Sequence, residues 1–593
     1  SRGLGDVYKR QGEDIVNMNY AAVDAGGKLV EKVEVPAEWA GIEVKEASHG
    51  VDMKRPEFVR SIVDPINALK GDLLPVSAFN GREDGTWDNG TAAWEKRGIA
   101  VNVPEWQIDN CIQCNQCAYV CPHAVIRPFL ATDEEAAASG VARKQGLGET
   151  KEYKFRIQIS PLDCTGCSNC VDVCPAKQKA LVMKPLESQL DQQKNWEYCN
   201  EKVGYKGDAV DKTRSVKNLQ FTQPLFEFSG ACAGCGETPY IKLVTQLFGD
   251  RMMIANSAGC AHVFSGSVPS APYCKNEKGR GPAWNSSLFE DTGEFGLGMF
   301  LGTRQVQKEM ASLAKKILEL HASSELDAAL TDWLDNQMVS EGTRERADRV
   351  IAALEPVKES SELLTELYEN KDYLPKRSQW LIGGDGWSYD IGYGGLDHAL
   401  AAGENINVLV LDTEVYSNTG GQASKATPTA AIAKFAASGK RTKKKDLGRI
   451  FMTYGYIYVA QVCIGADKAQ TLKALAEAEA YPGPSIVIAY CPCINHGIKT
   501  GMGLSQMEAK HAVDCGYWAL YRYNPQLVGT GVNPFTLDSK EPTMSFREFL
   551  MNEVRYASLL KAFPDEAEGL LEKTEKDAME RLAYYKKLAA EKE

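Results

Sequence analysis

Eight cysteines fall into two runs with the same spacing, C-x2-C-x2-C-x3-C followed by proline. A [4Fe–4S] cluster needs four thiolates at its corners. Three cysteines at intervals of three supply three of them, and in two-cluster proteins the fourth cysteine of each run binds the other cluster. The spacing therefore predicts one cluster on Cys111, Cys114, Cys117 and Cys174, and another on Cys164, Cys167, Cys170 and Cys121. Zinc is the competing hypothesis, but zinc prefers two separated C-x2-C pairs.

This segment resembles bacterial two-cluster ferredoxins, with a longer spacer between the two runs. The added spacer, Thr132 to Gly148, is rich in Ala and Glu and is expected to form an inserted helix or loop. Clusters joined by exchanged ligands lie close enough to pass electrons in sequence. The segment is therefore predicted to conduct electrons, and it needs a source of them.

A second group of residues follows two apolar runs that we predict to be strands. Gly384-Asp385-Gly386 follows one run, and the other ends at the polar stretch 412–418. Open α/β sheets bind ligands at the carboxyl ends of their strands. Mg²⁺ commonly takes one carboxylate together with phosphate oxygens. The pattern resembles the GDG…N signature of thiamine diphosphate enzymes, although a GDG alone is more often a turn.

Four more cysteines complete the pattern. Cys232 and Cys235 form a Gly-rich C-x2-C, Cys260 follows a glycine, and Cys491 and Cys493 lie far along the chain. Together with the other motifs they resemble the pyruvate:ferredoxin (flavodoxin) oxidoreductases, which use thiamine diphosphate, coenzyme A and three [4Fe–4S] clusters. The resemblance runs from about residue 12 to the end. It is clearest in the stretches 110–117, 417–422 and 492–497.

The resemblance implies a third cluster and a set of cofactor ligands. The third cluster would be held by Cys232, Cys235, Cys260 and Cys493. Cys491 could replace Cys493, and we favour Cys493 because it begins the Cys-Ile-Asn-His-Gly stretch. Mg²⁺ would be held by Asp385, Thr413 and the backbone carbonyl of Val415. Thiamine diphosphate would contact Glu237, Cys260, Gly384, Asp385, Gly386, Trp387, Thr413, Glu414, Val415, Tyr416, Ser417 and Asn418.

Three further features are interpreted one by one. Asn418 would face the substrate and is the one residue we expect to act in catalysis. His496 is expected to be a packing or hydrogen-bonding residue beside the third cluster. The basic run 440–445 could dock an acidic ferredoxin, but a solvated loop is favoured.

The resemblance implies oxidative decarboxylation of pyruvate to acetyl-CoA and CO₂, with single electrons passing to ferredoxin or flavodoxin. In that family the pyrimidine-side Glu, a substrate-binding Arg and the coenzyme A site lie in the amino-terminal half, and this sequence offers no equivalents. We therefore expect a carboxyl-terminal half that is inactive alone and belongs to a homodimer when complete. An enzyme for another 2-oxoacid and a non-catalytic electron-transfer subunit remain as alternatives.

Composition narrows the class of protein. Of 593 residues, 44% are hydrophobic and 25% charged, as in ordinary globular proteins, and no apolar run is long enough to span a bilayer. The net charge of −12 argues against nucleic acid as the main partner. Seventeen cysteines in a long acidic chain predict metal ligands in a reducing, cytoplasmic compartment rather than disulfides.

We predict that these motifs lie in a multidomain α/β and α+β protein. We predict that residues 1–11 are not native, that 12–50 are the tail of a preceding domain, that 51–205 form a ferredoxin-like domain with two [4Fe–4S] clusters, and that 206–593 form a thiamine-diphosphate-binding α/β domain with a parallel sheet and the third cluster. The polar segment 191–225 is predicted to be a linker. Apolar runs predict strands at Met252–Ala255, Trp380–Ile382, Val408–Leu411 and Ser485–Ala489. Helical periodicity predicts core-facing stripes at Val306, Met310, Leu313, Ile317 and Leu320, and at Ala578, Leu582, Tyr585 and Ala589.

Overall fold

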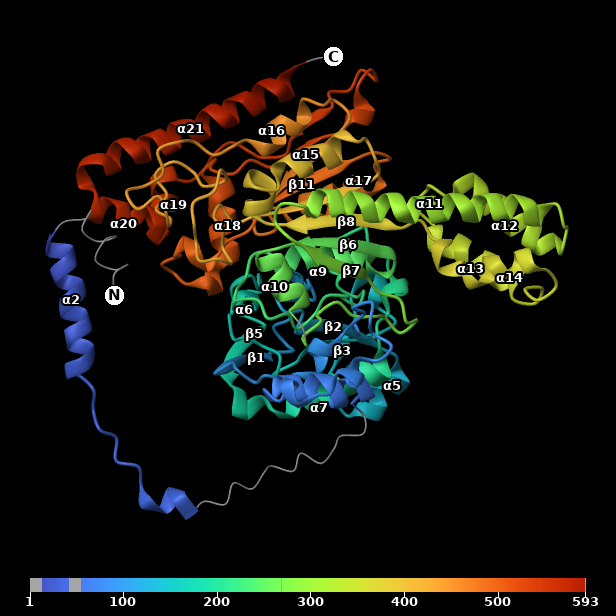
Figure 1. The fold of residues 1–593 in the computed structure, drawn as a ribbon, viewed down its shortest axis with the longest axis horizontal. Helices are drawn as coiled ribbons and strands as arrows, with labels where there is room; N and C mark the ends of the chain where they lie inside the picture. Colours follow the sequence, from blue (N-terminus) through green and yellow to red (C-terminus); the bar gives the residue numbers. More distant parts are fainter. Residues whose placement is uncertain (1–12, 42–54, 268, 592–593) are drawn as a thin grey trace. The chain divides into compact units, whose positions relative to one another are not determined.

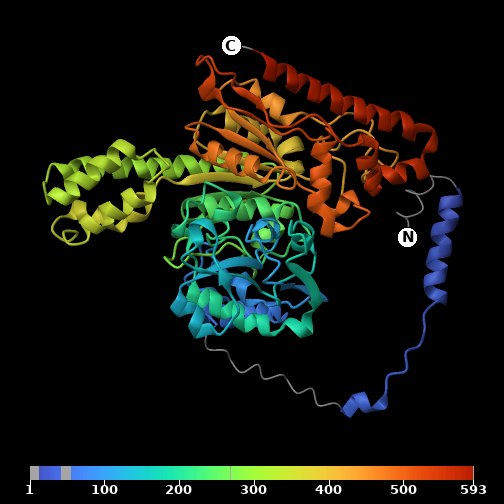
Figure 2. The same ribbon diagram turned by 180° about the vertical axis from the view of Figure 1, so that it is seen from behind.

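The computed structural model describes residues 13–41, 55–267 and 269–591. The chain divides into two compact units, one up to Pro56 and one from Glu57 onward. The first unit contains helix α2 (Glu13–Lys28) and a short 3-10 turn (Ala37–Gly41). The predicted non-native residues 1–11 lie outside the described residues. Both kinds of predicted site lie in the second unit, which is drawn from two opposite sides in Figures 1 and 2.

The cysteine-rich part of the second unit is built on small antiparallel sheets. Strands β2, β4 and β3 form one sheet in that order, and β1 pairs with β5. The strands are β1 (Asn102–Trp106), β2 (Ile126–Ala131), β3 (Lys144–Gln145), β4 (Lys154–Ile159) and β5 (Leu181–Pro185). The helices are α3 (Asp64–Asn67), α4 (Gln116–Val120), α5 (Asp133–Ser139), α6 (Asn169–Asp172), α7 (Asp191–Tyr198) and α8 (Val216–Leu219). The expected insertion is therefore α5 followed by the short strand β3.

The segment 191–225 is part of this core. Trp196, Cys199 and Val203 are buried in the same cluster as Phe129 and Phe155. A few apolar side chains at helical spacing anchor a segment that is otherwise polar and Lys-rich. The linker prediction is therefore wrong, because average polarity hides these anchors.

An eight-stranded sheet forms the other part of the unit. Its order is β13-β12-β10-β11-β9-β8-β6-β7; the six strands from β10 to β7 are parallel, and β12 at one end of the sheet pairs antiparallel with both β10 and the edge strand β13. The strands are β6 (Met252–Ser257), β7 (Ala283–Ser287), β8 (Ser378–Gly383), β9 (Asn407–Asp412), β10 (Tyr458–Val462), β11 (Ser485–Tyr490), β12 (Tyr521–Tyr523) and β13 (Phe535–Leu537). All four predicted strands and the predicted parallel sheet are confirmed.

Helices cover both faces of this sheet. Successive residues of a strand point to opposite faces, so Trp380 and Ile382 pack into one core with α9 and α17, whereas Leu381 packs into the other with α15 and α16. The helices that flank the sheet are α9 (Thr238–Phe248), α10 (Cys260–Gly266), α11 (Thr292–Leu318), α15 (Tyr393–Ala401), α16 (Leu447–Met452), α17 (Lys468–Ala480), α18 (Ser505–Asp514), α19 (Phe546–Asn552), α20 (Val554–Ala562) and α21 (Pro564–Ala590).

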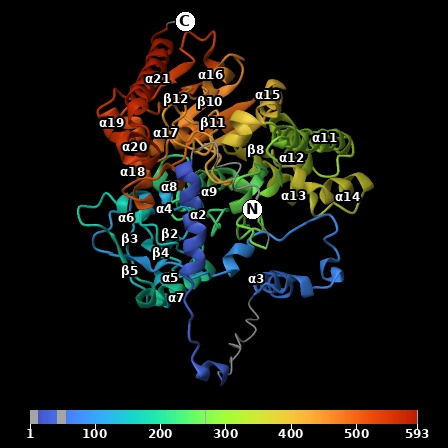
Figure 3. The ribbon, with the colours of Figure 1, turned by 60° about the vertical axis from the view of Figure 1, so that its left-hand side comes forward.

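The far end of α11 extends away from the sheet and packs with three further helices (Figures 1 and 3). These are α12 (Ser324–Asn336), α13 (Thr343–Leu354) and α14 (Glu362–Glu369). The predicted α11 stripe is buried or half-buried except for Leu320, which lies past the helix end and is exposed. The α21 stripe is likewise buried except for Ala589 in the last turn. Within the described ranges, we find no helix with the length and apolar character needed to cross a membrane.

Candidate cofactor and metal centres

The carboxyl ends of the parallel strands meet at one cavity of about 330 Å³. The loops after β6, β8 and β9 supply most of its wall. The lining residues are Glu237, Ala258, Gly259, Cys260, Ala261, Phe289, Gly384, Asp385, Gly386, Thr413, Val415, Tyr416, Ser417, Asn418 and Thr419. Most of the predicted thiamine-binding residues are thus brought together here.

The predicted Mg²⁺ ligands form one cradle in this wall. Asp385 Oδ2 accepts hydrogen bonds from the Thr413 hydroxyl (2.8 Å) and the Val415 amide (3.1 Å), and the Thr413 hydroxyl lies 3.1 Å from the Val415 carbonyl oxygen. The other carboxylate oxygen, Asp385 Oδ1, is buried without a hydrogen-bond partner. Burial and the neighbouring Asp412 raise the pKa of Asp385. A carboxylate, a hydroxyl and a carbonyl around one orphaned buried oxygen suit a small hard cation such as Mg²⁺.

Close packing explains the glycine after Asp385. A Cβ on Gly386 would lie 2.3 Å from the ring of Tyr416. Tyr416 lines the cavity, and Phe289 packs edge-on against it. Only glycine lets the two loops approach this closely.

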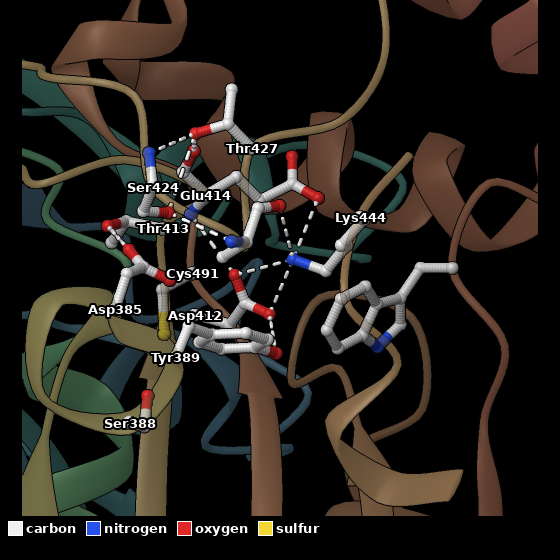
Figure 4. A network of polar contacts seen from close by, with 12 residues as sticks. Asp385, Ser388, Tyr389, Asp412, Thr413, Glu414, Ser424, Thr427, Lys444 and Cys491 are labelled. Atoms are coloured by element: carbon white, nitrogen blue, oxygen red, sulfur yellow. Dashed lines mark hydrogen bonds and ion pairs between the residues drawn. The ribbon is translucent and has the colours of Figure 1, made fainter. Parts of the chain in front are cut away.

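A buried ion network supports the cradle from behind (Figure 4). Lys444 Nζ lies 2.7 Å from Asp412 Oδ2 and 3.4 Å from Glu414 Oε1, so it bridges the two residues that flank Thr413. Glu414 has a left-handed backbone (φ 65°), which is uncommon for a residue with a side chain. Burial raises the pKa of Glu414, but Lys444 and Arg555 outweigh burial and lower it to about 2.

This network corrects the interpretation of the basic run 440–445. Lys440 donates to the carbonyl oxygens of Ser424 and Thr427, Lys444 is buried among carboxylates, and Arg441 pairs with Glu566. The run is therefore only in part a solvated loop: Lys440 and Lys444 bind internal groups, whereas Arg441 and Lys443 are exposed and pair with acidic side chains of α21.

Two predicted thiamine-binding residues lie outside the cavity wall. Trp387 is fully buried in the core under the sheet edge. Glu414 points its carboxylate away from the cavity, toward Arg555 (2.8 Å) and the Tyr517 hydroxyl (2.6 Å). Any role of these side chains toward the cofactor is therefore indirect.

The third cysteine group lies beside the cavity. Burial raises the pKa of the Cys260 thiol, and so do the nearby charges of Glu237, Cys235, Cys493 and Cys232. The four cysteines are thus close neighbours, and Cys260 also lines the cavity. Cys491 is fully buried, and its thiol donates to the carbonyl oxygen of Ala489 (3.3 Å). This arrangement favours Cys493 over Cys491 as the ligand.

The two cysteine runs surround two separate cavities of about 330 and 320 Å³. The structure groups them with exchanged fourth cysteines, as expected. One cavity is lined by Cys111, Cys114, Cys117 and Cys174, and the other by Cys121, Cys164, Cys167 and Cys170. Among the described residues, no three His, Cys, Asp or Glu side chains converge closely enough to hold a single ion. Four cysteines around each cavity are the donor set that a [4Fe–4S] cluster takes.

Comparisons with known families identify both regions. Residues 110–178 match the "4Fe-4S dicluster domain", residues 369–489 match the "Thiamine pyrophosphate enzyme, C-terminal TPP binding domain", and residues 45–100 match a "Domain of unknown function". The chain is 56% identical to a pyruvate-flavodoxin oxidoreductase of Klebsiella pneumoniae over 98% of its own length and 50% of the relative's. It is a homologue of the pyruvate:flavodoxin and pyruvate:ferredoxin oxidoreductases.

Two other relatives support this assignment. The pyruvate:ferredoxin oxidoreductase of Moorella thermoacetica is 56% identical over 98% of this chain and 50% of the relative. The NADP-linked mitochondrial pyruvate dehydrogenase of Euglena gracilis is 46% identical over 98% of this chain and 32% of the relative. The chain thus spans about half the length of the pyruvate:flavodoxin and pyruvate:ferredoxin oxidoreductases that it matches. The predicted fold class and the predicted iron–sulfur and thiamine diphosphate cofactors are confirmed.

The cavities of this oxidoreductase homologue form a series. Ser505 Oγ lies 3.2 Å from the carbonyl oxygen of Gly234, in the loop of the third group, and 3.1 Å from the side chain of Asn169, which lines the cavity of Cys164. The cavity of Cys111 is lined by Ile112, whose side chain is exposed. The third cysteine group is therefore next to the thiamine cavity, and the Cys111 cavity reaches the surface at Ile112; Cys232 of the third group is also exposed.

Sequence reasoning missed several residues of the site. Phe289 follows β7, whose polar sequence gave no strand signal. Lys444 was hidden in a basic run. His496 was expected to be a hydrogen-bonding residue, and its Nε2 donates to the carbonyl oxygen of Thr413 (2.7 Å), so it braces the cradle loop.

Proposed function

We propose that this chain forms the diphosphate side of a thiamine site and the electron path of an enzyme that oxidises pyruvate, with coenzyme A, to acetyl-CoA and CO₂. The observation that carries the proposal is the position of Cys260. It lies in the wall of the thiamine cavity and also within the third cysteine group. A cofactor that releases single electrons needs an electron acceptor beside it, and a cluster on this cysteine group would be one.

The chain's residues have separate tasks in this proposal. Asp385, the Thr413 hydroxyl and the Val415 carbonyl would hold Mg²⁺ against the diphosphate. Thiamine diphosphate, when bound, supplies the electron sink for loss of CO₂. Exposed Asn418, at the cavity wall, would orient the 2-oxoacid.

Electrons would leave through three [4Fe–4S] clusters in a fixed order. The first would be held by Cys232, Cys235, Cys260 and Cys493, the second by the Cys164 group, and the third by the Cys111 group. The acceptor, ferredoxin or flavodoxin, would dock near exposed Ile112. We further propose a cytoplasmic homodimer for the complete enzyme.

Purification of the complete enzyme without oxygen tests this function. We expect viologen reduction that requires both pyruvate and coenzyme A, and about twelve iron atoms for each copy of this chain. About eight iron atoms would remove the third cluster from the proposal. Activity with a different 2-oxoacid and none with pyruvate would replace the proposed substrate. Absence of bound thiamine diphosphate would leave only an electron-transfer protein.

A further inference from the structure

A buried lysine contacts the backbone of the stretch that joins a cysteine of one ferredoxin-type cavity, Cys117, to a cysteine of the other, Cys121. Lys242 belongs to α9, which packs against α4, the short helix between the last two cysteines of the first run. Its ammonium donates to the carbonyl oxygens of Ala118, Tyr119 (2.7 Å) and Cys121 (3.3 Å). The residue is 2% exposed. Water therefore cannot stabilise its charge.

Lys242 differs from the other buried cation of this region. Arg127 has a carboxylate partner, Glu227, and a hydroxyl partner, Tyr205. Lys242 forms no ion pair with a carboxylate of the described chain, and its protein partners are neutral carbonyls. An ammonium buried without a counter-charge is costly. Its presence points to anionic groups that occupy the neighbouring cavities.

The carbonyls that accept from Lys242 belong to a stretch that carries ligands of both cavities. Its ammonium contacts the carbonyl oxygen of Cys121 and that of Ala118, the residue after Cys117. Cys117 lines the cavity of the Cys111 group, whereas Cys121 lines the cavity of the Cys164 group. One cation is therefore placed to act on two clusters.

We propose that Lys242 is a fixed positive charge shared by the two ferredoxin-type clusters and that it raises the reduction potential of both. Each cluster gains one electron on reduction and becomes more negative, so a nearby buried cation stabilises the reduced form. The inference rests on the dicluster part of the proposed function and not on its substrate. A failure to oxidise pyruvate would leave it intact.

The alternative is that Lys242 only caps the end of α4. Lysines commonly donate to the last carbonyls of a helix. A cap affects the stability of the fold, whereas a shared charge also changes the potentials. Cluster potentials therefore separate the two roles.

Potentiometric titration of the cluster-loaded protein, followed by paramagnetic resonance, makes this test. In Lys242→Met we expect both midpoint potentials to fall, with each one-electron equilibrium changed by about tenfold, or about 59 mV. Lys242→Arg keeps the charge and should keep both potentials. Unchanged potentials in Lys242→Met would overturn the proposal.

Lys179→Met is the matched control. Lys179 also donates to two carbonyls of a cluster loop, those of Asp172 (2.8 Å) and Cys174 (2.9 Å), but it is exposed and screened by water. We expect its effect to stay below about threefold. An equal shift in both variants would show that burial is irrelevant and would contradict the proposal.

A variant that loses its clusters is also informative. If Lys242→Met and Lys242→Gln both lose iron while Lys242→Arg retains it, the positive charge is required and the proposal stands. Loss of iron from all three variants would mean that the shape of lysine, not its charge, matters, and would overturn it.

Discussion

The cluster-binding part and the sheet edge build their sites in opposite ways. Each ferredoxin-type cavity takes three of its four cysteines from one short loop, as with Cys111, Cys114 and Cys117. The thiamine cavity takes its wall from loops after several strands, so that Glu237 and Asn418, which are far apart in the sequence, line the same cavity. The first kind of site is set by local spacing, and the second by the packing of a whole sheet.

The two regions also handle charge differently. In the cluster-binding part, burial raises the pKa of Cys164 to about 12 and that of Cys167 to about 11, so burial disfavours negative charge at these two sulfurs. The sheet edge instead holds a permanent network in which Lys444 and Arg555 face buried carboxylates. Damage to the network should therefore disturb thiamine binding and spare the clusters.

Asp385→Ala is expected to give the largest difference between the two regions, with cofactor binding lost and the clusters retained. The change removes the only carboxylate of the cradle, so Mg²⁺-dependent affinity for thiamine diphosphate should fall by about 100-fold or more. Iron content should not change. Calorimetric titration with the cofactor and Mg²⁺ measures the loss. Asp397→Asn is the control, because it removes a carboxylate charge on α15 outside the cavity wall and leaves an oxygen that can still accept from the Tyr454 hydroxyl. Equal affinity in Asp385→Ala and the control would mean that the GDG is merely a turn.

Cys174→Ser is expected to have the opposite effect, with a cluster lost and cofactor binding retained. Cys174 lies in the second run but lines the cavity of the first. The variant should lose or alter the Cys111 cluster, with up to about four iron atoms missing, and bind thiamine diphosphate normally. Paramagnetic resonance distinguishes the clusters. Loss of the Cys164 cluster alone would contradict the exchanged pairing.

A more moderate effect is expected from Lys444→Met, which tests the network directly. Removing the ammonium leaves Asp412 and Glu414 buried without this partner, at a cost of about 3 kcal/mol in the free energy of unfolding. The flanked Thr413 loop should loosen, so cofactor affinity should fall by about tenfold. Lys443→Met is the control, because its ammonium is exposed and 3.5 Å from Glu580, and should cost at most about 0.5 kcal/mol. If thermal unfolding and cofactor titration cannot tell the two variants apart, the network does not support the cradle.

The same contrast explains what the sequence could predict. Cysteine spacing reveals the cluster ligands because the loops that carry them are local. The strands β8 and β9 are buried on both faces and appear as continuous apolar runs. The edge strand β7 is polar and has no fully buried residue, so its sequence gives no strand signal and Phe289 after it cannot be placed from the sequence.

The predictions for the run 440–445 and the segment 191–225 fail, the first of them in part, because both rest on averages over a segment. The mean charge of the first and the mean polarity of the second do not show which single side chains are buried. Each segment depends on a single side chain, Lys444 or Trp196, whose burial is decided by distant parts of the chain. The composition of a segment does not predict the burial of either side chain.

A further expected effect is a pH dependence that belongs to the network alone. Arg555 contacts two buried carboxylates, Glu414 (2.8 Å) and Glu553 (2.7 Å), and Lys444 adds its charge only to Glu414. Glu414 therefore stays ionised, whereas burial raises the pKa of Glu553 to about 8. In the unfolded chain Glu553 ionises near its ordinary value of 4.5. Between these values the folded state holds the extra proton, so its contribution to stability is full at low pH and is lost as pH rises, by up to about 1.4 kcal/mol per pH unit.

Glu553→Gln isolates this contribution, because the amide can still accept from Arg555 but has no proton to lose. Relative to the wild type, the variant's Tm should rise steadily from about pH 4.5 to about pH 8 and then level off. Glu568→Gln, at an exposed ion pair with Arg547, should show no such trend. Parallel Tm curves for the wild type and Glu553→Gln would mean that Glu553 is ionised in the folded protein. Arg555 would then face two ionised carboxylates, and the network would not contain one ionised and one protonated glutamate.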